Sequence, residues 1–261
     1  MNPPSLIGMV HLLPLPGSPR FNGKTDQVLE RATADAMALE EAGFGGLMVE
    51  NFGDDPFYPD NVPPVTIAGI TAAVKAVQAA VSIPVGVNVL RNDAIAALGI
   101  AAVTDAAYIR VNVLTGTMFT DQGTIEGKAA QVVRERLRLC ANTLILADVL
   151  VKHASPPQGL KIEQAGLDTW ERGGADALIV SGHGTGAEPN LDHAIRLRKA
   201  VPEAHILIGS GASPSNLALL ARAANGAIVG TSLKVDGRTT GPVDASRASA
   251  MVEAAAKVGW V

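Results

Sequence analysis

A regular alternation of short apolar runs and helical patterns is the feature that most constrains the fold of this chain. The apolar runs are LIGMV, GGLMVE, PVGVNVL, AYIRVNV, TLILADV, DALIVS, HILIG and GAIVG. They are nearly continuous in hydrophobicity, which is typical of parallel strands covered on both faces. Eight strands, each followed by a helix, predict an α/β fold, a single (β/α)₈ barrel of the TIM type, because open doubly wound sheets commonly have five or six strands.

Helices are expected between these runs. Alanine or leucine recurs there at helical spacing, and two of the patterns stop at Gly43 and Gly173, as helices often do. The chain of 261 residues has no composition shift or long linker and matches the roughly 250 residues of one barrel, so residues 1–261 are predicted to form one domain. The expected helical ranges are 27–42, 65–81, 93–104, 127–141, 162–173, 191–200, 215–224 and 245–258.

Two turns rich in glycine and hydroxyl groups follow the last two apolar runs. Glycine lets backbone N–H groups approach an anion, and hydroxyl groups add donors. Barrels usually hold phosphate at these two strand ends, so the turns predict a phosphate cradle, although ordinary βα turns also favour Gly and Ser. The turns consist of Gly209, Ser210 and Gly211, which lead into Ala212-Ser213-Pro214, and of Gly230, Thr231 and Ser232.

Polar residues end the other apolar runs, at the face where such barrels place their active sites. A packed barrel interior normally takes branched apolar side chains, so many polar groups together require mutual hydrogen bonds or a ligand. The catalytic candidates are Glu50, Asn88, Arg110, Asp148 and Lys152. The expected substrate-binding residues are His11, Asn112, His153 and Ser181 beside the turn residues, and His183 and Thr185 follow the same run as Ser181. Any one of them could instead close an ion pair or bond a loop carbonyl.

Side chains alternate between faces along a strand, which groups some of these candidates. Arg110 and Asn112 are expected on one side of their strand. Asp148 and Lys152 are likewise expected to share a side, with His153 pointing the other way.

Two chemical routes are open for these residues. In the first, Asp148 or Glu50 takes a proton next to a carbonyl while Arg110 and Asn88 stabilise the developing oxyanion. In the second, the Lys152 amine, kept neutral by burial, forms a Schiff base with a ketose or aldose.

No cofactor is predicted, and a catalytic metal is not expected. Glu50, Asp148, His11 and His153 carry suitable ligand atoms, but HxH, HExxH and clustered Asp patterns are lacking from the sequence. The pattern Gly209-x-Gly211-x-x-Pro214 resembles a dinucleotide fingerprint, yet proline stands where the third glycine belongs.

The segment TGTMFTDQGTIEG, residues 115–127, follows the fourth apolar run. It is too polar and too rich in glycine for a predicted strand or helix. We therefore expect a loop, either a lid over the site or a passive surface segment.

Composition excludes several classes of protein. A net charge of −4 without basic clusters argues against nucleic-acid binding, and the single Cys140 rules out a disulfide framework within the chain. The first residues have no Lys or Arg before Arg20 and contain prolines, unlike a secretory signal, and no segment reaches the roughly 20 apolar residues of a membrane span. We expect a cytoplasmic protein without a membrane partner, forming a homo-oligomer.

Five segments carry a family resemblance: MVHLLPLPGSP, VENFGDDPF, VGVNVLRND, TDQGTIEG and ADVLVKHA. The combination of these segments resembles the BtpA/SgcQ family, and the resemblance covers nearly the whole chain. The resemblance implies a barrel similar to those that bind ribulose phosphate, with a phosphate site, and it brings no residue-by-residue catalytic assignment. The founding member of that family is linked to photosystem I accumulation in cyanobacteria, a role that nothing else in this sequence indicates.

Two functions follow as expectations. The first is an enzyme that acts on a small phosphorylated sugar or related metabolite by isomerisation, aldol-type cleavage or glycosidic-bond chemistry. The second is a non-catalytic assembly or stability factor of the photosystem I type, docking a partner on an outer face. Within the enzyme class a nucleotide substrate is a further alternative, although an aromatic content of 3% offers no visible platform for stacking a base.

Overall fold

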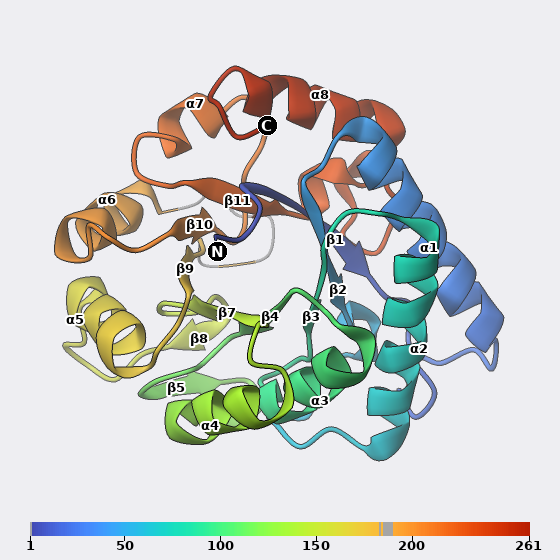
Figure 1. Ribbon diagram of the computed structural model, residues 1–261, viewed down its shortest axis with the longest axis horizontal. Coiled ribbons are helices and arrows are strands. Elements are labelled where there is room, and N and C mark those ends of the chain that lie inside the picture. Colours follow the sequence, from blue (N-terminus) through green and yellow to red (C-terminus); the bar gives the residue numbers. More distant parts are fainter. Residues whose placement is uncertain (1, 183, 185–189) are drawn as a thin grey trace.

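The computed structural model describes residues 2–182, 184 and 190–261, and its centre is a closed barrel of eight parallel strands (Figure 1). The predicted (β/α)₈ barrel is confirmed, and every apolar run contains a strand. Around the barrel the order is β1-β11-β10-β9-β7-β4-β3-β2. The strand bounds are β1 Leu6–His11, β2 Gly46–Glu50, β3 Val85–Asn88, β4 Tyr108–Val111, β7 Leu144–Asp148, β9 Ala177–Val180, β10 Ile206–Ile208 and β11 Gly226–Val229.

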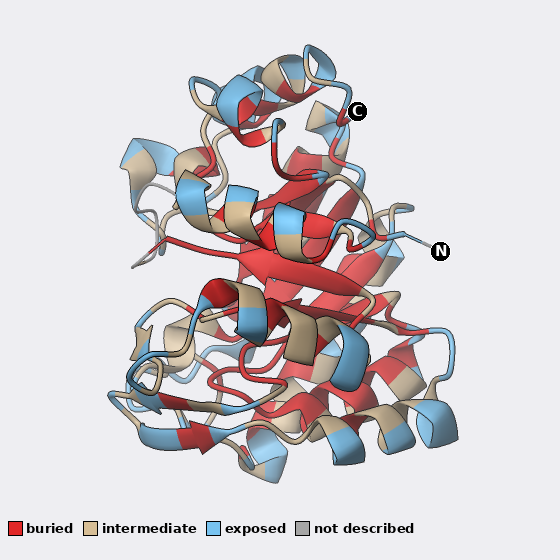
Figure 2. Ribbon diagram, turned by 90° about the vertical axis from the view of Figure 1, so that its left-hand side faces the viewer, coloured by how far each residue is buried: buried red, intermediate tan, exposed pale blue. Residues whose placement is uncertain are grey.

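Helices surround the barrel, and Figure 2 shows buried strands inside a layer of helices whose outer faces are exposed. α6 has the expected bounds, whereas the pattern expected over 215–224 forms only the short helix α7. None of the described helices is long and apolar enough to cross a membrane. The helix bounds are α1 Thr25–Ala42, α2 Pro64–Ala80, α3 Ala94–Thr104, α4 Ala129–Leu139, α5 Ile162–Leu167, α6 Leu191–Ala200, α7 Leu217–Leu220 and α8 Ala245–Ala256.

Local sequence sets several helix ends. The side chains of Asp93, Asn190 and Asp244 accept hydrogen bonds from backbone N–H groups in the first turns of α3, α6 and α8. Such caps satisfy donors that have no partner inside the helix. α1 ends at Gly43, whose φ of 102° is left-handed and favours glycine.

The barrel interior is filled by an apolar layer below the strand ends. Tyr108 lies fully buried in this layer and donates a hydrogen bond from its hydroxyl to the Leu47 carbonyl at 2.7 Å. A Cβ on Gly86 of the neighbouring strand would lie 2.0 Å from the Tyr108 ring, so only glycine fits there. The layer comprises Ile7, Met9, Met48, Tyr108, Leu146, Ala177, Ile179, Leu207 and Ile228.

The segment after β4 corrects one sequence prediction. Instead of a loop without strands, it forms a hairpin of β5 Thr117–Thr120 and β6 Gly123–Glu126, to which β8 Ala154–Ser155 adds a third antiparallel strand. Met118 and Ile125 pair across the hairpin and pack with Val113 and Val151 in a separate small core. These two apolar residues anchor the hairpin to its small core. The other residues of both strands are mostly polar, so the sequence shows no clear alternation of apolar and polar residues.

Candidate functional site

One polar layer closes the barrel at the carboxyl ends of the strands. In the register of the first four strands, His11 pairs with Glu50, Glu50 with Asn88, and Asn88 with Arg110. Alternate residues of a strand face the same side. Each of these four residues comes two positions after a residue that faces the barrel interior, so its side chain also faces inward, one layer higher. The same alternation continues around the barrel and places all eight members at predicted site positions: His11, Glu50, Asn88, Arg110, Asp148, Ser181, Gly209 and Gly230.

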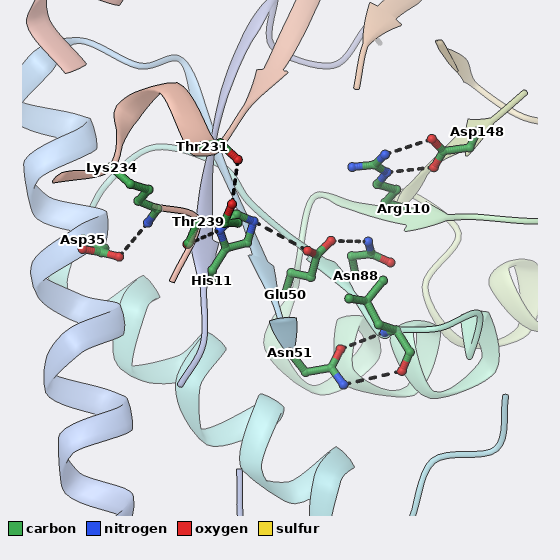
Figure 3. A network of polar contacts seen from close by, with 11 residues as sticks. His11, Asp35, Glu50, Asn51, Asn88, Arg110, Asp148, Thr231, Lys234 and Thr239 are labelled. Atoms are coloured by element: carbon green, nitrogen blue, oxygen red, sulfur yellow. Dashed lines mark hydrogen bonds and ion pairs between the residues drawn. The ribbon is translucent and has the colours of Figure 1, made fainter. Parts of the chain in front are cut away.

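Glu50 lies between two partners (Figure 3). Asn88 Nδ2 donates to its Oε2 at 2.6 Å, and His11 Nε2 lies 3.6 Å from its Oε1. His11 Nδ1 lies 3.2 Å from the Thr239 carbonyl oxygen. A carbonyl oxygen can only accept a hydrogen bond, so Nδ1 carries the hydrogen and donates it. Burial, with the nearby cations Lys234 and Lys152, holds the pKa of His11 well below its usual value. His11 is therefore neutral at pH 7, with the unprotonated Nε2 toward Glu50.

Arg110 and Asp148 form a buried bidentate pair. The Arg110 Nε and Nη2 donate to the two Asp148 oxygens at 2.8 and 2.9 Å. Asn112 Nδ2 and Ser181 Oγ donate to the same carboxylate at 3.1 and 3.3 Å. Four donors thus occupy Asp148, which leaves it poorly placed to accept a proton from a substrate. The Asp148 carboxylate instead orients Arg110 and Asn112.

Lys152 contributes a mostly buried amine beside Arg110. Within the part of the chain that the structure describes, its Nζ makes no hydrogen bond or ion pair. Burial, together with the positive charge of Arg110, lowers the pKa of Lys152 to about 8. Arg91 Nη2 donates to the Lys152 carbonyl at 2.5 Å and holds the backbone of this loop.

Two cavities meet at the polar layer. The smaller, of about 160 Å³, lies over the two turns predicted to hold phosphate. The larger, of about 720 Å³, opens on the other side, below the tip of the β5–β6 hairpin at Asp121 and Gln122. Both are lined by His11, Glu50, Arg110 and Lys152. A ligand that fills both cavities therefore has its middle over these four side chains.

The smaller cavity is bordered by backbone donors. The N–H groups of Gly211, Ala212, Thr231 and Ser232 bond to no backbone or side-chain acceptor among the described residues. Glycine at two strand ends makes the space: a Cβ on Gly209 would lie 3.0 Å from Arg110 Nη2, and one on Gly230 would lie 2.9 Å from His11 Cε1.

The hydroxyl groups of the two turns are already engaged with the protein. Ser210 Oγ accepts from the Gly182 N–H at 3.0 Å, and Ser232 Oγ donates to the Ala212 carbonyl at 2.8 Å. The Thr231 hydroxyl bonds to that of Thr239 at 2.9 Å. These bonds brace the two turns, but among the turn hydroxyls only that of Ser232 must use its hydrogen in them. The Ser210 hydroxyl, which accepts, and one hydroxyl of the Thr231–Thr239 pair can still donate to an anion beside the backbone N–H groups.

The remaining sequence candidates lie around the larger cavity or outside the described residues. Asn112 and the exposed His153 line the larger cavity. Lys152 and His153 were expected on opposite sides of a strand, but β7 ends at Asp148 and both residues lie in the loop that follows. His183 and Thr185 lie outside the described residues.

Sequence reasoning missed a buried ion pair that supports the site. Lys234 Nζ lies 2.8 Å from Asp35 Oδ2 of α1, and both side chains are almost completely buried. Asp35 also accepts a hydrogen bond from the Val243 N–H at 2.8 Å, so it fixes both ends of the loop that carries Thr239. The sequence signal that could have revealed this pair is Asp35 itself, an acidic residue at a core-facing position of α1.

Phe52 and Phe57 were also missed, and both line the larger cavity. They belong to the segment VENFGDDPF directly after β2. The sequence prediction rested on the low aromatic content of the whole chain and did not consider that these two phenylalanines lie close together in the sequence.

No cluster of three or more His, Cys, Asp or Glu side chains able to hold a metal ion occurs within residues 2–182, 184 and 190–261. Glu50, which lines both cavities, and the neighbouring Asp148 are bonded to nitrogen donors of adjacent side chains. Asp55 and Asp121, which line the larger cavity, accept from Arg20 and Gln122. Such an arrangement suits organic anions and hydroxyl groups better than a hard cation, which needs several free oxygen ligands.

The fold is a (β/α)₈ barrel whose polar layer, at the carboxyl ends of its strands, borders two cavities and forms a candidate site. Residues 2–257 match the model of the BtpA family. The chain belongs to the BtpA family.

Relatives of similar length support this membership. Over 252 residues, 97% of this chain and 88% of the relative, it is 48% identical to the photosystem I biogenesis protein BtpA of Synechocystis sp.. It is 50% identical to an uncharacterized protein of Thermococcus kodakarensis, over 96% of this chain and 94% of that protein. The sgc region protein SgcQ of Escherichia coli is 29% identical over 95% of this chain and 93% of its own.

Solved structures with low sequence identity share the barrel. A tryptophan synthase chain of Mycobacterium tuberculosis aligns with a TM-score of 0.62 at 20% identity, covering 99% of this chain and 93% of that one. A structure titled native KDPGal aligns with a TM-score of 0.61 at 15% identity, covering 100% and 98%. At these identities the likeness concerns the fold alone.

Proposed function

We propose that the protein is an enzyme that acts on a small phosphorylated sugar or related metabolite. The observation that carries the proposal is the meeting of two cavities over His11, Glu50, Arg110 and Lys152. The smaller cavity offers unpaired backbone N–H groups to a phosphate, and the shared side chains lie where the carbon skeleton would follow. A homo-oligomer and a cytoplasmic location remain predictions.

The phosphate would be held by the turns after β10 and β11. The N–H groups of Gly211, Ala212, Thr231 and Ser232 have no other acceptor in the described chain, so an anion would satisfy them. Arg110 and Lys152 line the same cavity and add positive charge. Neutral His11 adds no charge and shapes the wall.

Glu50 is the better candidate for proton transfer. Its Oε1 faces a neutral imidazole at 3.6 Å and borders both cavities, whereas Asp148 already accepts from Arg110, Asn112 and Ser181. Glu50 would take a proton next to a substrate carbonyl, and Arg110 would stabilise the oxyanion that develops. This chemistry serves isomerisation and aldol-type cleavage, and the same carboxyl group could assist cleavage of a glycosidic bond.

Lys152 supplies the second route. A pKa of about 8 leaves a substantial neutral fraction of its amine near neutral pH. The neutral amine would attack a ketose or aldose carbonyl, and loss of the carbonyl oxygen as water would leave a Schiff base. Borohydride reduction in the presence of a phosphorylated carbonyl compound would leave an adduct on Lys152 for this route and none for acid–base catalysis by Glu50.

The phosphate site can be tested by thermal unfolding with inorganic phosphate and ribose 5-phosphate. At 100 times Kd a ligand stabilises the native state by about 2.7 kcal/mol, which for a chain of this size raises Tm by about 5–10 °C. Gly211→Ala should abolish the shift, since Gly211 has φ +74° and borders the cavity. Gly259→Ala is the matched control, with φ +75° and open space around the added Cβ.

Turnover provides the second arm of this test. Glu50→Gln should lower turnover of a phosphorylated substrate by about 100-fold, the typical contribution of a general acid or base, while the phosphate-dependent shift in Tm persists. Absence of any shift with both probes would remove the phosphate proposal. Unchanged turnover in Glu50→Gln would remove Glu50 as the proton carrier.

The second candidate function is assembly or stabilisation of a partner. It is favoured by the 48% identity to a protein named for photosystem I biogenesis. Co-purification of a stable heterologous partner from a native extract, without thermal stabilisation by either phosphate probe, would favour this function over the enzyme.

A further inference from the structure

The larger cavity has one apolar wall that the phosphate site does not use. Phe52 and Phe57 line it with Leu12, Leu13, Pro14 and Leu90. Among the described residues, neither phenylalanine belongs to the hydrophobic clusters that form the barrel core. Two of the five phenylalanines in the chain therefore face a cavity instead of contributing to the core.

The wall is held in place by the backbone. The Gly53 N–H donates to the Leu12 carbonyl at 3.1 Å, and the Leu15 N–H donates to Asp54 Oδ1 at 2.8 Å. A Cβ on Gly53 would lie 2.5 Å from the Pro14 nitrogen, so the two segments are in direct contact. The Phe52 ring centroid lies 4.7 Å from that of His11 at an angle of 34°. Phe52 is thus fixed next to the polar layer.

A polar acceptor without a donor accompanies this wall. Asn112 also lines the cavity, and its Oδ1 is buried without a hydrogen-bond partner among the described residues. The orientation of this amide is determined, because Nδ2 donates to the Asp148 carboxylate at 3.1 Å and the oxygen could not take that place. A buried acceptor of this kind needs an N–H or O–H donor, and a ligand in the larger cavity can supply one.

Building on the phosphate site proposed above, we propose that the substrate carries a flat heteroaromatic group that binds in the larger cavity. The ring lies against Phe52 and Phe57, and a ring N–H or a neighbouring hydroxyl donates to Asn112 Oδ1. The guanidinium of Arg91, held through its bond to the Lys152 carbonyl, borders the same space and can stack on a ring. A small sugar phosphate alone would leave the apolar wall in contact with water.

Calorimetric binding to the full chain tests this proposal with three kinds of probe. They are ribose 5-phosphate, the 5′-monophosphates of adenosine and uridine, and the two nucleosides without phosphate. At least one monophosphate should bind at least about five times more tightly than ribose 5-phosphate, because stacking of a base on aromatic side chains adds about 1 kcal/mol or more to binding. The nucleosides should bind more weakly than their monophosphates.

Two matched variants locate the ring. Phe57→Leu keeps the site apolar and should weaken the monophosphate by at least fivefold while changing ribose 5-phosphate by less than twofold. Phe119→Leu makes the same substitution at an exposed position of β5 that lines neither cavity, and should change neither affinity.

The outcomes separate this proposal from the one on which it rests. If ribose 5-phosphate binds but neither monophosphate binds more tightly, the heteroaromatic substrate is wrong and the phosphate site stands. Equal effects of Phe57→Leu and Phe119→Leu would also overturn the ring site. If no phosphorylated probe binds, both proposals fail.

Discussion

The Lys152 amine is mostly buried and has no paired anion among the residues that the structure describes, and its chemical reactivity should reflect this environment. Because its folded-state pKa of about 8 lies below the ordinary 10.5, neutral amine accumulates above pH 8. Reductive methylation, which needs the neutral amine, should rise with a midpoint near pH 8 at Lys152. Quantification of each lysine by mass spectrometry measures this, with the exposed Lys161 as the internal reference.

The lowered pKa of Lys152 also makes the stability of the protein depend on pH. Between pH 8 and 10.5 the unfolded chain binds more protons than the folded one, so the contribution of Lys152 to stability increases with pH in that window. Lys152→Met should flatten this part of the pH profile of the free energy of unfolding. A methylation midpoint for Lys152 near 10.5 would contradict both expectations.

The buried Arg110–Asp148 pair should respond strongly to loss of one charge. Asp148→Asn leaves the guanidinium buried without a counter-ion, and breaking such a pair typically costs about 3–5 kcal/mol. Urea unfolding measures the change. Glu135→Gln removes the partner of the exposed Arg138 on α4 and should cost less than about 1 kcal/mol. Similar losses in both variants would argue against a special role for the buried pair.

At this scale the sequence predicted which residues occupy the polar layer but not how they pair. Period-two alternation identifies Arg110 and Asp148 as strand ends, yet their contact depends on β4 and β7 being neighbours across an inserted hairpin. Lys234 lies two residues after the second predicted turn, and nothing local indicated that it would be buried against Asp35 of α1. Contacts between residues distant in sequence need the closed barrel before they can be inferred.

Among the elements, the β5–β6–β8 sheet is the part most separable from the barrel. Its small core joins Met118 and Ile125 to two residues of neighbouring loops. Ile125→Ala should cost about 2 kcal/mol, the lower end for a buried isoleucine, because this satellite core can partly collapse. Hydrogen exchange should accelerate over residues 117–126 and remain slow in the barrel strands.

Phe119→Ala on the same hairpin serves as the control. Its side chain is 51% exposed, so the free energy of unfolding should change by no more than about 0.5 kcal/mol. Faster exchange throughout the barrel in Ile125→Ala would show that the sheet and the barrel unfold as one unit.

The elements show where sequence patterns suffice. α6 has its predicted bounds because Asn190 caps its start and the pattern is amphipathic. α7 is shorter than its leucine-rich pattern predicts, since turns replace the helix after Leu220. The hairpin escaped prediction because Thr, Gly and Asp dominate its composition and only two residues per strand pair face inward. Alternation over four residues is too short a signal to outweigh such a composition.

In the whole molecule, stability and function occupy successive layers of one barrel. The apolar layer around Tyr108 closes the interior, and the polar layer two residues further along each strand closes the top. The two glycines in that layer, Gly209 and Gly230, lie on adjacent strands and open the smaller cavity on one side. The site is therefore asymmetric because two of the eight positions lack side chains.

Buried neutral histidines should make the molecule sensitive to mild acid. Burial lowers the pKa of His11 and of His205, which begins the segment before β10 and whose Nε2 has no partner among the described residues. Below pH 6.5 the unfolded chain takes up protons that the folded chain excludes, so stability falls as pH decreases. From pH 7 to 5.5 a fully buried imidazole such as His11 lowers the free energy of unfolding by about 1 kcal/mol, and the half-buried His205 lowers it by less. In urea titrations the double variant His11→Gln, His205→Gln should therefore lose at least about 1 kcal/mol less than the parent over this range. An equal loss in both proteins would show that these imidazoles take up protons as readily in the native state as in the unfolded chain, which would contradict the lowered pKa of His11.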